Sequence, residues 1–304
     1  MADRPPFPAV LDSTIIAAAR SCGQKANLEF FAHWKSAEPS VHLRAGAAYA
    51  SGLEAARNAF YAEGLDKEAA EAVGVSACMK AYGDFQCPTD SAKSLERTCG
   101  ALEFYFDQYP FGEDKAIPIT LPSGKRGIEF SFAEPLEILH PETEEPIIYC
   151  GRLDMLVDFD GLKLGLDDKT TSQLGASWPR QWDLRSQFTG YCWGAAKAAG
   201  IKLDGFLVRG VSILKTRYDT LQAITYRPQW QIDRWYHQLH DDIEGLIAQW
   251  KYGRWNFNLD HACAEYGGCQ FRQVCLMQDA TALLEQQFQR RVWDPIARTE
   301  TVLP

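Results

Sequence analysis

The clearest pattern in the chain is an alternation of apolar and polar positions over residues 151 to 172, GRLDMLVDFDGLKLGLDDKTTS. An Asp-Gly pair at positions 160 and 161 lies in its middle. This pair favours a type I′ turn, because both central residues of that turn need positive φ. A turn at this place pairs Val157 with Leu164 and makes one face of the hairpin apolar.

The opposite face of the predicted hairpin carries charge. The same register places Asp154 opposite Asp167, with Lys169 on the same side and Asp168 on the other face. Directly opposed Cβ atoms lie about 5 Å apart, where like charges repel. We therefore expect a divalent cation between Asp154 and Asp167, although a β-bulge would exchange Asp167 for Asp168 as the ligand.

The hydrophobic pattern before this hairpin changes from a helical period to a period of two. Residues 12 to 110 predict helices, one ending near Gly64 and one beginning after CPTD (87 to 90), with Thr89 or Asp90 as its cap. From about residue 116 the period becomes two, which predicts a hairpin turning at Ser123-Gly124.

The second half of the chain predicts two helices and two more strands. Ser177 before Trp-Pro is a start signal and Gly200 a stop signal, which predicts a helix crossing over the sheet. Strands are expected at 204 to 214 and 219 to 227, followed by a long amphipathic helix from Pro228 to Gly253. The expected fold class is α/β, with a central mixed sheet flanked by helices.

Composition restricts the class of protein. The chain has 304 residues, 46% of them hydrophobic and 23% charged, which suffices for a substantial core. A formal net charge of -9 argues against a generally adhesive nucleic-acid binder, but a local basic groove remains compatible with it. The acidic, proline-containing start lacks the pattern of a signal peptide, and no later run is long enough to span a bilayer, so we expect a cytoplasmic protein.

The nine cysteines form a second candidate site. CAEYGGCQFRQVC places Cys263, Cys269 and Cys275 in a compact loop, and Cys22 in RSCGQK, between basic residues that lower a thiolate pKa, is the best fourth ligand. Spacing alone leaves other candidates for that fourth position: Cys78, Cys87, Cys99, Cys150 and Cys192. Zinc or a [4Fe-4S] cluster would suit four thiolates, and unrelated buried cysteines are the remaining interpretation.

Three ordered motifs resemble those of the PD-(D/E)XK nuclease superfamily. They are Gly151 with Asp154, Asp167 with Lys169, and Gln187 with Tyr191 on the following helix. The last pair is typical of the RecB-like branch. One amino-terminal cysteine followed by three carboxy-terminal ones resembles the iron-sulfur nucleases of that branch, which include AddB-type domains, CRISPR-associated RecB-like exonucleases and stand-alone phage proteins.

The resemblance implies a domain organisation. Residues 1–110 would form a helical region contributing one cluster cysteine, and residues 111–230 a restriction-endonuclease-like nuclease core. Residues 231–304 would add the last helix and the other three cysteines, packed as one unit with the core.

The resemblance also implies an activity, a metal-dependent DNA exonuclease acting on DNA ends or single strands in recombination, repair or phage replication. Asp154, Asp167 and the backbone carbonyl of Asp168 would bind Mg²⁺ or Mn²⁺, and Lys169 would orient the attacking water. Gln187 and Tyr191 would line the site. Cys22, Cys263, Cys269 and Cys275 would hold a structural [4Fe-4S] cluster, with zinc as the alternative. The expected location is a bacterial or phage-infected host cytoplasm, with recombination or replication proteins as further partners.

One position departs from this family. Tyr49 stands where many RecB-like nucleases have a histidine metal ligand, and His42 aligns poorly with that position. Glu54 and Glu129 are alternative carboxylates, each expected to be an ordinary surface or sheet residue. Five basic residues near the motifs are possible phosphate contacts, each expected instead on a solvated face: Arg152, Arg180, Arg185, Lys197 and Arg209.

Two alternatives to a nuclease therefore stay open. The first is a DNA-binding accessory protein whose nuclease-like site is degenerate, as the missing histidine permits. The second is a zinc-clamped structural protein whose hairpin acids form a solvated face.

Overall fold

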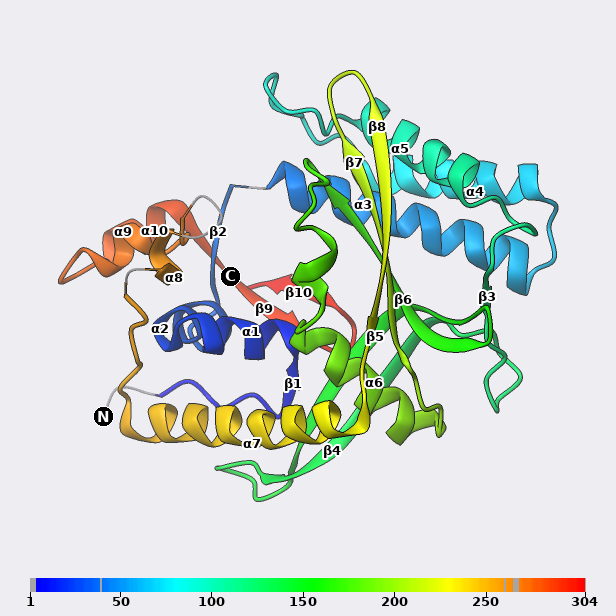
Figure 1. Ribbon diagram of the computed structural model, residues 1–304. Helices are drawn as coiled ribbons and strands as arrows, with labels where there is room; N and C mark the ends of the chain where they lie inside the picture. The colour runs from blue at the N-terminus through cyan, green and yellow to red at the C-terminus, as the bar shows by residue number, and fades with distance from the viewer. Residues whose placement is uncertain (1–3, 39, 260, 265–267, 304) are drawn as a thin grey trace. The chain divides into compact units, whose positions relative to one another are not determined.

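The computed structural model describes residues 4–38, 40–259, 261–264 and 268–303. The chain divides into two compact units, each assembled from separate stretches of sequence (Figure 1). The first unit contains Met1–Glu38, Phe132–Gly151 and Asp233–Pro304, and the second contains Pro39–Ser131 and Arg152–Ile232.

A mixed sheet forms the centre of the second unit. Its strands follow the order β5 (Pro146–Phe159), β6 (Leu162–Thr171), β7 (Gly205–Ile213) and β8 (Tyr218–Tyr226). The β6–β7 pair is parallel and the β5–β6 and β7–β8 pairs are antiparallel. Two further strands, β3 (Ala116–Pro118) and β4 (Ile128–Leu139), pair with β5.

The hairpin predicted from the alternating pattern is confirmed. Asp160 and Gly161 have φ of 51° and 86°, as the two central residues of a type I′ turn require. Val157 lies opposite Leu164, and the paired ladder continues to Met155 opposite Leu166. The next residue on each strand beyond this last pair is an aspartate, Asp154 on β5 and Asp167 on β6.

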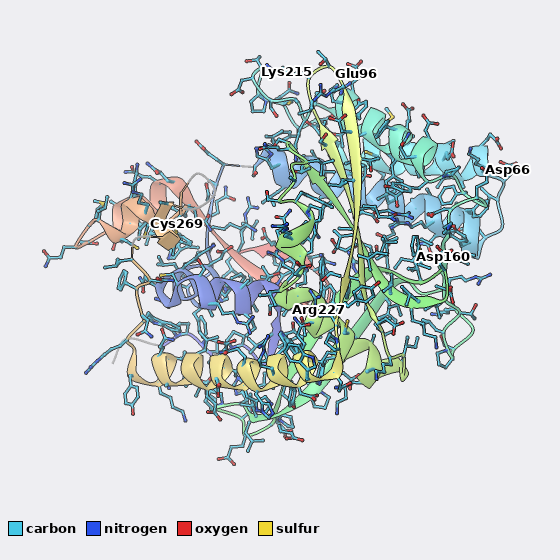
Figure 2. All side chains as sticks on the ribbon, in the orientation of Figure 1. Asp66, Glu96, Asp160, Lys215, Arg227 and Cys269 are labelled. Carbon is cyan, nitrogen blue, oxygen red and sulfur yellow. The ribbon has the colours of Figure 1, made fainter. Side chains whose placement is uncertain are left out.

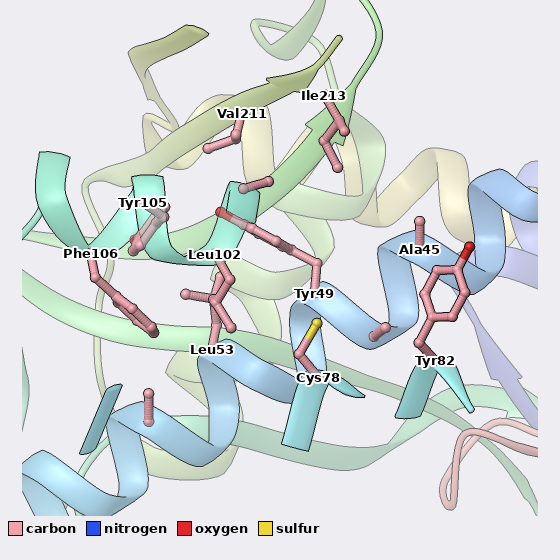
Figure 3. Packing of buried hydrophobic residues seen from close by; sticks show 13 residues of the cluster. Ala45, Tyr49, Leu53, Cys78, Tyr82, Leu102, Tyr105, Phe106, Val211 and Ile213 are labelled. Atoms are coloured by element: carbon pink, nitrogen blue, oxygen red, sulfur yellow. The ribbon is translucent and has the colours of Figure 1, made fainter. Parts of the chain in front are cut away.

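Helices cover both faces of this sheet. Because side chains alternate along a strand, Val211 and Ile213 of β7 share one face, where they pack with Tyr49 of α3 (Val41–Arg57) and Tyr105 of α5 (Leu95–Gln108) (Figure 3). Phe206 points to the other face, where its ring stacks on Phe188 of α6 (Ser186–Ala199) with the centroids 4.4 Å apart. Helix α4 (Lys67–Tyr82) packs against α3, and η2 (Asn58–Ala62) continues α3. The predicted α/β fold class, a central mixed sheet flanked by helices, is confirmed.

Two predicted helix starts are wrong. Helix α5 is capped by Ser94, whose hydroxyl accepts a 3.2 Å hydrogen bond from the Arg97 amide, and not by Thr89 or Asp90. The Trp-Pro signal begins only a short 3-10 helix, η3 (Pro179–Trp182), and α6 starts separately. The carbonyl of Trp182 accepts a 2.6 Å hydrogen bond from the Arg227 guanidinium and a 3.2 Å bond from the Arg185 amide, three residues on instead of the four of an α-helix. The predicted end of α6 at Gly200, with φ 65°, is confirmed.

The remaining elements belong wholly or mostly to the first unit. They are β1 (Val10–Asp12), α1 (Ser13–Ser21), α2 (Gly23–Ala26), η1 (Asn27–Phe31), β2 (Trp34–Ser36), α7 (Gln229–Tyr252), α8 (His261–Ala264), α9 (Arg272–Cys275), α10 (Thr281–Gln287), β9 (Phe288–Asp294) and β10 (Thr299–Val302). Asp12 caps α1 by accepting from the amides of Thr14 and Ile15, and its other oxygen accepts from the Trp293 indole. Within the described ranges, no helix combines the length and apolarity that crossing a membrane would need.

Candidate active site and cysteine cluster

Three charged groups of the hairpin meet on the α6 face of the sheet. The Lys169 ammonium lies 2.5 Å from Oδ2 of Asp167, whose side chain is 6% exposed. Asp154 lies close enough to Asp167 to affect its ionisation, and its Oδ2 accepts a 2.9 Å hydrogen bond from the amide of Asp168. This backbone bond fixes the Asp154 carboxylate at the point where β5 and β6 stop pairing.

The electrostatics of this group are those of crowded acids. The pKa of Asp167 rises to about 6, because burial and the Asp154 carboxylate together outweigh the opposing effect of Lys169. Burial would lower the pKa of Lys169, but the carboxylates of Asp167 and Asp154 outweigh burial and raise it. The ammonium is therefore held charged, and Asp167 takes up a proton at mildly acidic pH.

Helix α6 adds two side chains to this face. The Gln187 amide donates a 2.9 Å hydrogen bond to the phenol oxygen of Tyr191, one turn further along the helix. Tyr191 is 4% exposed and lies close enough to Lys169 to contribute to its raised pKa. The structure therefore brings Asp154, Asp167, Lys169, Gln187 and Tyr191 to one face of the sheet.

Asp168 lies on the other face, as the register predicts, and its partners were not found from the sequence. The Arg57 guanidinium of α3 binds its Oδ2 at 2.6 Å, and both side chains are buried. Arg57 also donates to the Tyr105 hydroxyl, which accepts a second bond from Arg209. Burial raises the pKa of Asp168 and Arg57 lowers it. The pair anchors β6 to α3 directly behind Asp167 and Lys169.

Arg209 corrects the expectation for one basic residue. Its side chain is 1% exposed and makes two 2.7 Å hydrogen bonds to the carboxylate of Asp114. It therefore does not lie on a solvated face, because Asp114 and Tyr109 cover its guanidinium. Three other basic residues are exposed as expected: Arg180, Arg185 and Lys197.

Two carboxylates that the sequence suggested only as alternatives lie near Asp154. Glu129 has φ 49° and pairs with Arg152 at 2.8 Å. Burial raises its pKa to about 8, with Asp154 and Glu54 adding to the rise. Glu54, on α3, therefore also belongs to this group of acids. Glu129 is therefore not the ordinary sheet residue expected from the sequence, because it is largely buried beside other acids.

Tyr49 lies on the Asp168 side of β6. Its hydroxyl is buried and has no hydrogen-bond partner among the described residues. Burial, followed by the Asp168 carboxylate, raises its pKa well above 10, so it stays a neutral phenol at physiological pH. A neutral phenol is a poor substitute for a histidine ligand. His42 is exposed on the first turn of α3.

The donor chemistry around Asp167 suits a hard divalent cation, because two carboxylates and a neighbouring carbonyl supply only oxygen ligands. In the described parts of the chain, however, no three His, Cys, Asp or Glu side chains are already arranged to hold a metal ion. The positive charge beside Asp167 is the Lys169 ammonium. The residues fit such an ion by donor type and by proximity.

The four predicted cluster cysteines all belong to the first unit. Burial raises the pKa of the Cys275 thiol, and Cys269, Cys22 and Cys263 each raise it further, so all three lie close to Cys275. Cys22 lies between α1 and α2, with its thiol 3.6 Å from the carbonyl of Asn256. Figure 2 shows Cys269 beside the short helices α8 and α9.

Packing holds the described part of the segment that carries three of these cysteines. Phe271 is fully buried, and its ring stacks on that of Phe288 with centroids 5.3 Å apart. The Cys269 amide donates to the carbonyl of Cys263, and the Cys275 amide donates to the carbonyl of Phe271. The other five cysteines lie elsewhere, and among them the sulfurs of Cys78 and Cys99 are 3.7 Å apart.

Comparisons with known proteins give only distant structural similarity. No protein-family profile matches the chain, and no curated protein matches it. A crystal structure of a candidate exonuclease from Eubacterium rectale is 12% identical, with a TM-score of 0.43 over 83% of this chain and 86% of that one. The crystal structure of a protein designated SSO0001 is 13% identical, with a TM-score of 0.28 over 64% of this chain and 74% of that one.

Proposed function

We propose that the protein is a metal-dependent deoxyribonuclease that hydrolyses phosphodiester bonds, with DNA ends or single strands as its substrate. The observation that carries the proposal is the meeting of Asp154, Asp167 and Lys169 on one face of the sheet, beside Gln187 and Tyr191. Acids crowded in this way destabilise the fold unless a cation or a proton offsets them. A protein that only needed to fold would not require them.

Asp154, Asp167 and the carbonyl of Asp168 would hold Mg²⁺ or Mn²⁺. When bound, such an ion supplies Lewis acidity, which lowers the pKa of water and offsets charge on phosphate. Lys169, held charged by its carboxylate neighbours, would orient the attacking water and stabilise charge on the phosphate oxygens. Gln187 fixes the Tyr191 phenol beside Lys169, so both side chains would position the phosphate.

The buried pair of Asp168 and Arg57 would act indirectly. Asp168 donates its amide to Asp154 and binds Arg57 with its side chain, so one residue links the α6 face to α3. Positioning of this kind keeps reacting groups in place without contact to the substrate.

For the cysteine group we propose a [4Fe-4S] cluster with a structural role, held by Cys22, Cys263, Cys269 and Cys275. The support is the proximity of the other three thiols to Cys275. Four thiolates also suit zinc, which is the alternative ion.

A DNA-binding accessory protein with a degenerate site is the second candidate function. The neutral phenol of Tyr49, in place of a histidine ligand, is the observation that favours it. Burial of Asp167 and Asp168 speaks against the third possibility, in which the hairpin acids are a solvated face.

Degradation of end-labelled DNA tests the proposal. Linear and circular, single- and double-stranded substrates would be incubated with Mg²⁺, Mn²⁺ or chelator, using the wild type and Asp167→Ala. Asp160→Asn is the matched control, because it removes an exposed carboxylate from the same hairpin and Asn tolerates the turn conformation. Metal-dependent cleavage lost only in Asp167→Ala supports a nuclease, whereas binding without cleavage by the wild type supports the accessory protein.

A further inference from the structure

A cavity in the second unit is lined by several polar and basic residues that the proposed chemistry does not use. Its volume is about 610 Å³, within the usual range for ligand pockets. Its lining includes Val41, His42, Ser91, Lys93, Ser172 and Lys215. Ser172 directly follows strand β6, and Lys215 lies in the loop that follows β7 (Figure 2).

Lys93 is the unusual member of this lining. The residue is 4% exposed and lines the cavity. The hydrogen bonds and ion pairs of the described residues that involve Lys93 use its backbone and not its ammonium. Burial lowers the pKa of Lys93, and no carboxylate opposes that effect. A partly desolvated ammonium without an ionic partner costs free energy in the folded state. A ligand of negative charge would compensate it.

The first turn of α3 faces the same cavity through Val41 and His42. The amides of a first turn have no acceptor inside the helix, and the helix dipole makes this end of a 17-residue helix positive. Lys215 and the hydroxyls of Ser91 and Ser172 add further groups suited to phosphate oxygens. Asp90 also lines the cavity and is exposed, so solvent screens its charge.

Both walls of the cavity are held in place by residues outside it. The buried Tyr82 hydroxyl donates a 2.7 Å hydrogen bond to the carbonyl of Lys93. Arg97 donates two hydrogen bonds to the carbonyl of Leu214 and stacks over the Tyr218 ring. A cavity with fixed walls loses little conformational entropy when a ligand binds.

We propose that this cavity binds the terminal phosphate monoester of a DNA strand, an inference that rests on the proposed function. A terminal phosphate carries about 1.5 to 2 negative charges at pH 7, so it compensates Lys93 better than an internal phosphodiester does. Strand β6 connects the two sites. Ser172 is three residues beyond Lys169, or about 10 Å of extended strand. The cavity lies on the α3 side of the sheet and the Lys169 side chain on the α6 side.

The test measures binding without cleavage. Fluorescence anisotropy of the wild-type full chain in EDTA would compare single-stranded oligonucleotides that differ only in a 5′ or a 3′ terminal phosphate. We expect the phosphate at one end to strengthen binding about tenfold or more. Lys93→Met should remove this difference, because it keeps the apolar stem and deletes the charge, whereas Lys202→Ala, an exposed lysine outside the cavity, should keep it.

A stability measurement separates binding from folding. Because the Lys93 ammonium is partly desolvated and has no ionic partner among the described residues, Lys93→Met should leave the melting temperature unchanged or raise it. If Lys93→Met unfolds the chain, Lys215→Ala replaces it, since Lys215 is exposed. Inorganic phosphate at increasing concentration should compete with the phosphorylated oligonucleotide for the wild type.

Three outcomes would overturn this proposal: equal binding with and without terminal phosphates, equal weakening of both oligonucleotides by Lys93→Met, and no effect of either lysine variant. The second outcome would assign the cavity to internal phosphodiesters. Phosphate-dependent binding by a protein that never cuts DNA would support the cavity and contradict the nuclease. If the protein cleaves DNA but binds it equally with and without a terminal phosphate, the proposed role of the cavity is wrong and the nuclease proposal stands.

Discussion

The side-chain amide of Gln187 donates a 2.9 Å hydrogen bond to the phenol oxygen of Tyr191, and Tyr191 lies beside Lys169. The amide thereby fixes the phenol relative to the ammonium. Gln187→Leu should therefore lower the rate of DNA cleavage about 10- to 100-fold, as losing an outer positioning group commonly does. Measurement of kcat and KM for Gln187→Leu, Tyr191→Phe and the double variant checks this. If the loss of cleavage rate in the double variant equals the product of the two single losses, the two side chains do not act as a pair.

Divalent cations should stabilise the fold through Asp154 and Asp167. An ion that binds only the folded state at about 100 times its Kd adds about 2.7 kcal/mol to the free energy of unfolding. Thermal melting with and without Mn²⁺ should show a rise in Tm for the wild type and for Asp160→Asn. It should show none for Asp167→Asn. A rise that persists in Asp167→Asn would place the ion elsewhere.

Glu129 should make stability depend on pH. Burial raises its pKa from 4.5 to about 8, so the folded state holds this proton more tightly than the unfolded state. Stability from this group is complete below pH 4.5 and is lost as pH rises to about 8. Glu129→Gln should therefore melt above the wild type at pH 9 and close to it at pH 4.5. The same offset at both pH values would show that ionisation of Glu129 is not involved.

The buried pair of Arg57 and Asp168 should be sensitive to the loss of one partner. Arg57→Leu leaves a buried carboxylate uncompensated and should cost about 3 to 5 kcal/mol of unfolding free energy. The cost should be smaller at pH 5 than at pH 8, because the pKa of Asp168 rises further without Arg57 and the acid becomes neutral. Denaturant unfolding of Arg57→Leu and of Arg57→Leu with Asp168→Asn checks this. A double variant no more stable than the single one would contradict it.

Cys269 should be required for a bound metal or cluster. Protein purified without oxygen should be brown with a broad band at about 400 nm, as iron-thiolate centres are. Cys269→Ser should lose iron and melt at lower temperature, since the cluster binds only the folded state. Cys87→Ser, which alters a cysteine of the second unit, should keep both properties. A colourless protein that contains zinc would show that these cysteines hold zinc and not an iron-sulfur cluster.

The hairpin could be predicted because its determinants are local. A turn at Asp160 and Gly161 sets the register, and the pleat then assigns Asp167 and Lys169 to one face and Asp168 to the other. The glycine stop of α6 at Gly200 is equally local.

What the sequence did not reveal depends on contacts between distant segments. Arg57 lies in an Ala-rich helix with no local signal that it binds Asp168, which is 111 residues away. The raised pKa of Glu129 arises from burial and from acids on α3 and β5. Arg227 binds the Trp182 carbonyl from 45 residues away. Ser94 competes with Thr89 and Asp90 as a cap, and only packing decides between them. The expected boundaries at residues 110 and 230 remain predictions.

The order in which the two units appear along the chain has a consequence for protein synthesis. The second unit ends at Ile232, whereas the first still needs Asp233–Pro304, which carries Cys263, Cys269 and Cys275. Domains commonly fold as they leave the ribosome, at about 5 to 20 residues per second. Asp154, Asp167 and Lys169 can therefore be assembled on a nascent chain several seconds before the last cysteine emerges, so iron insertion would follow formation of the acidic site.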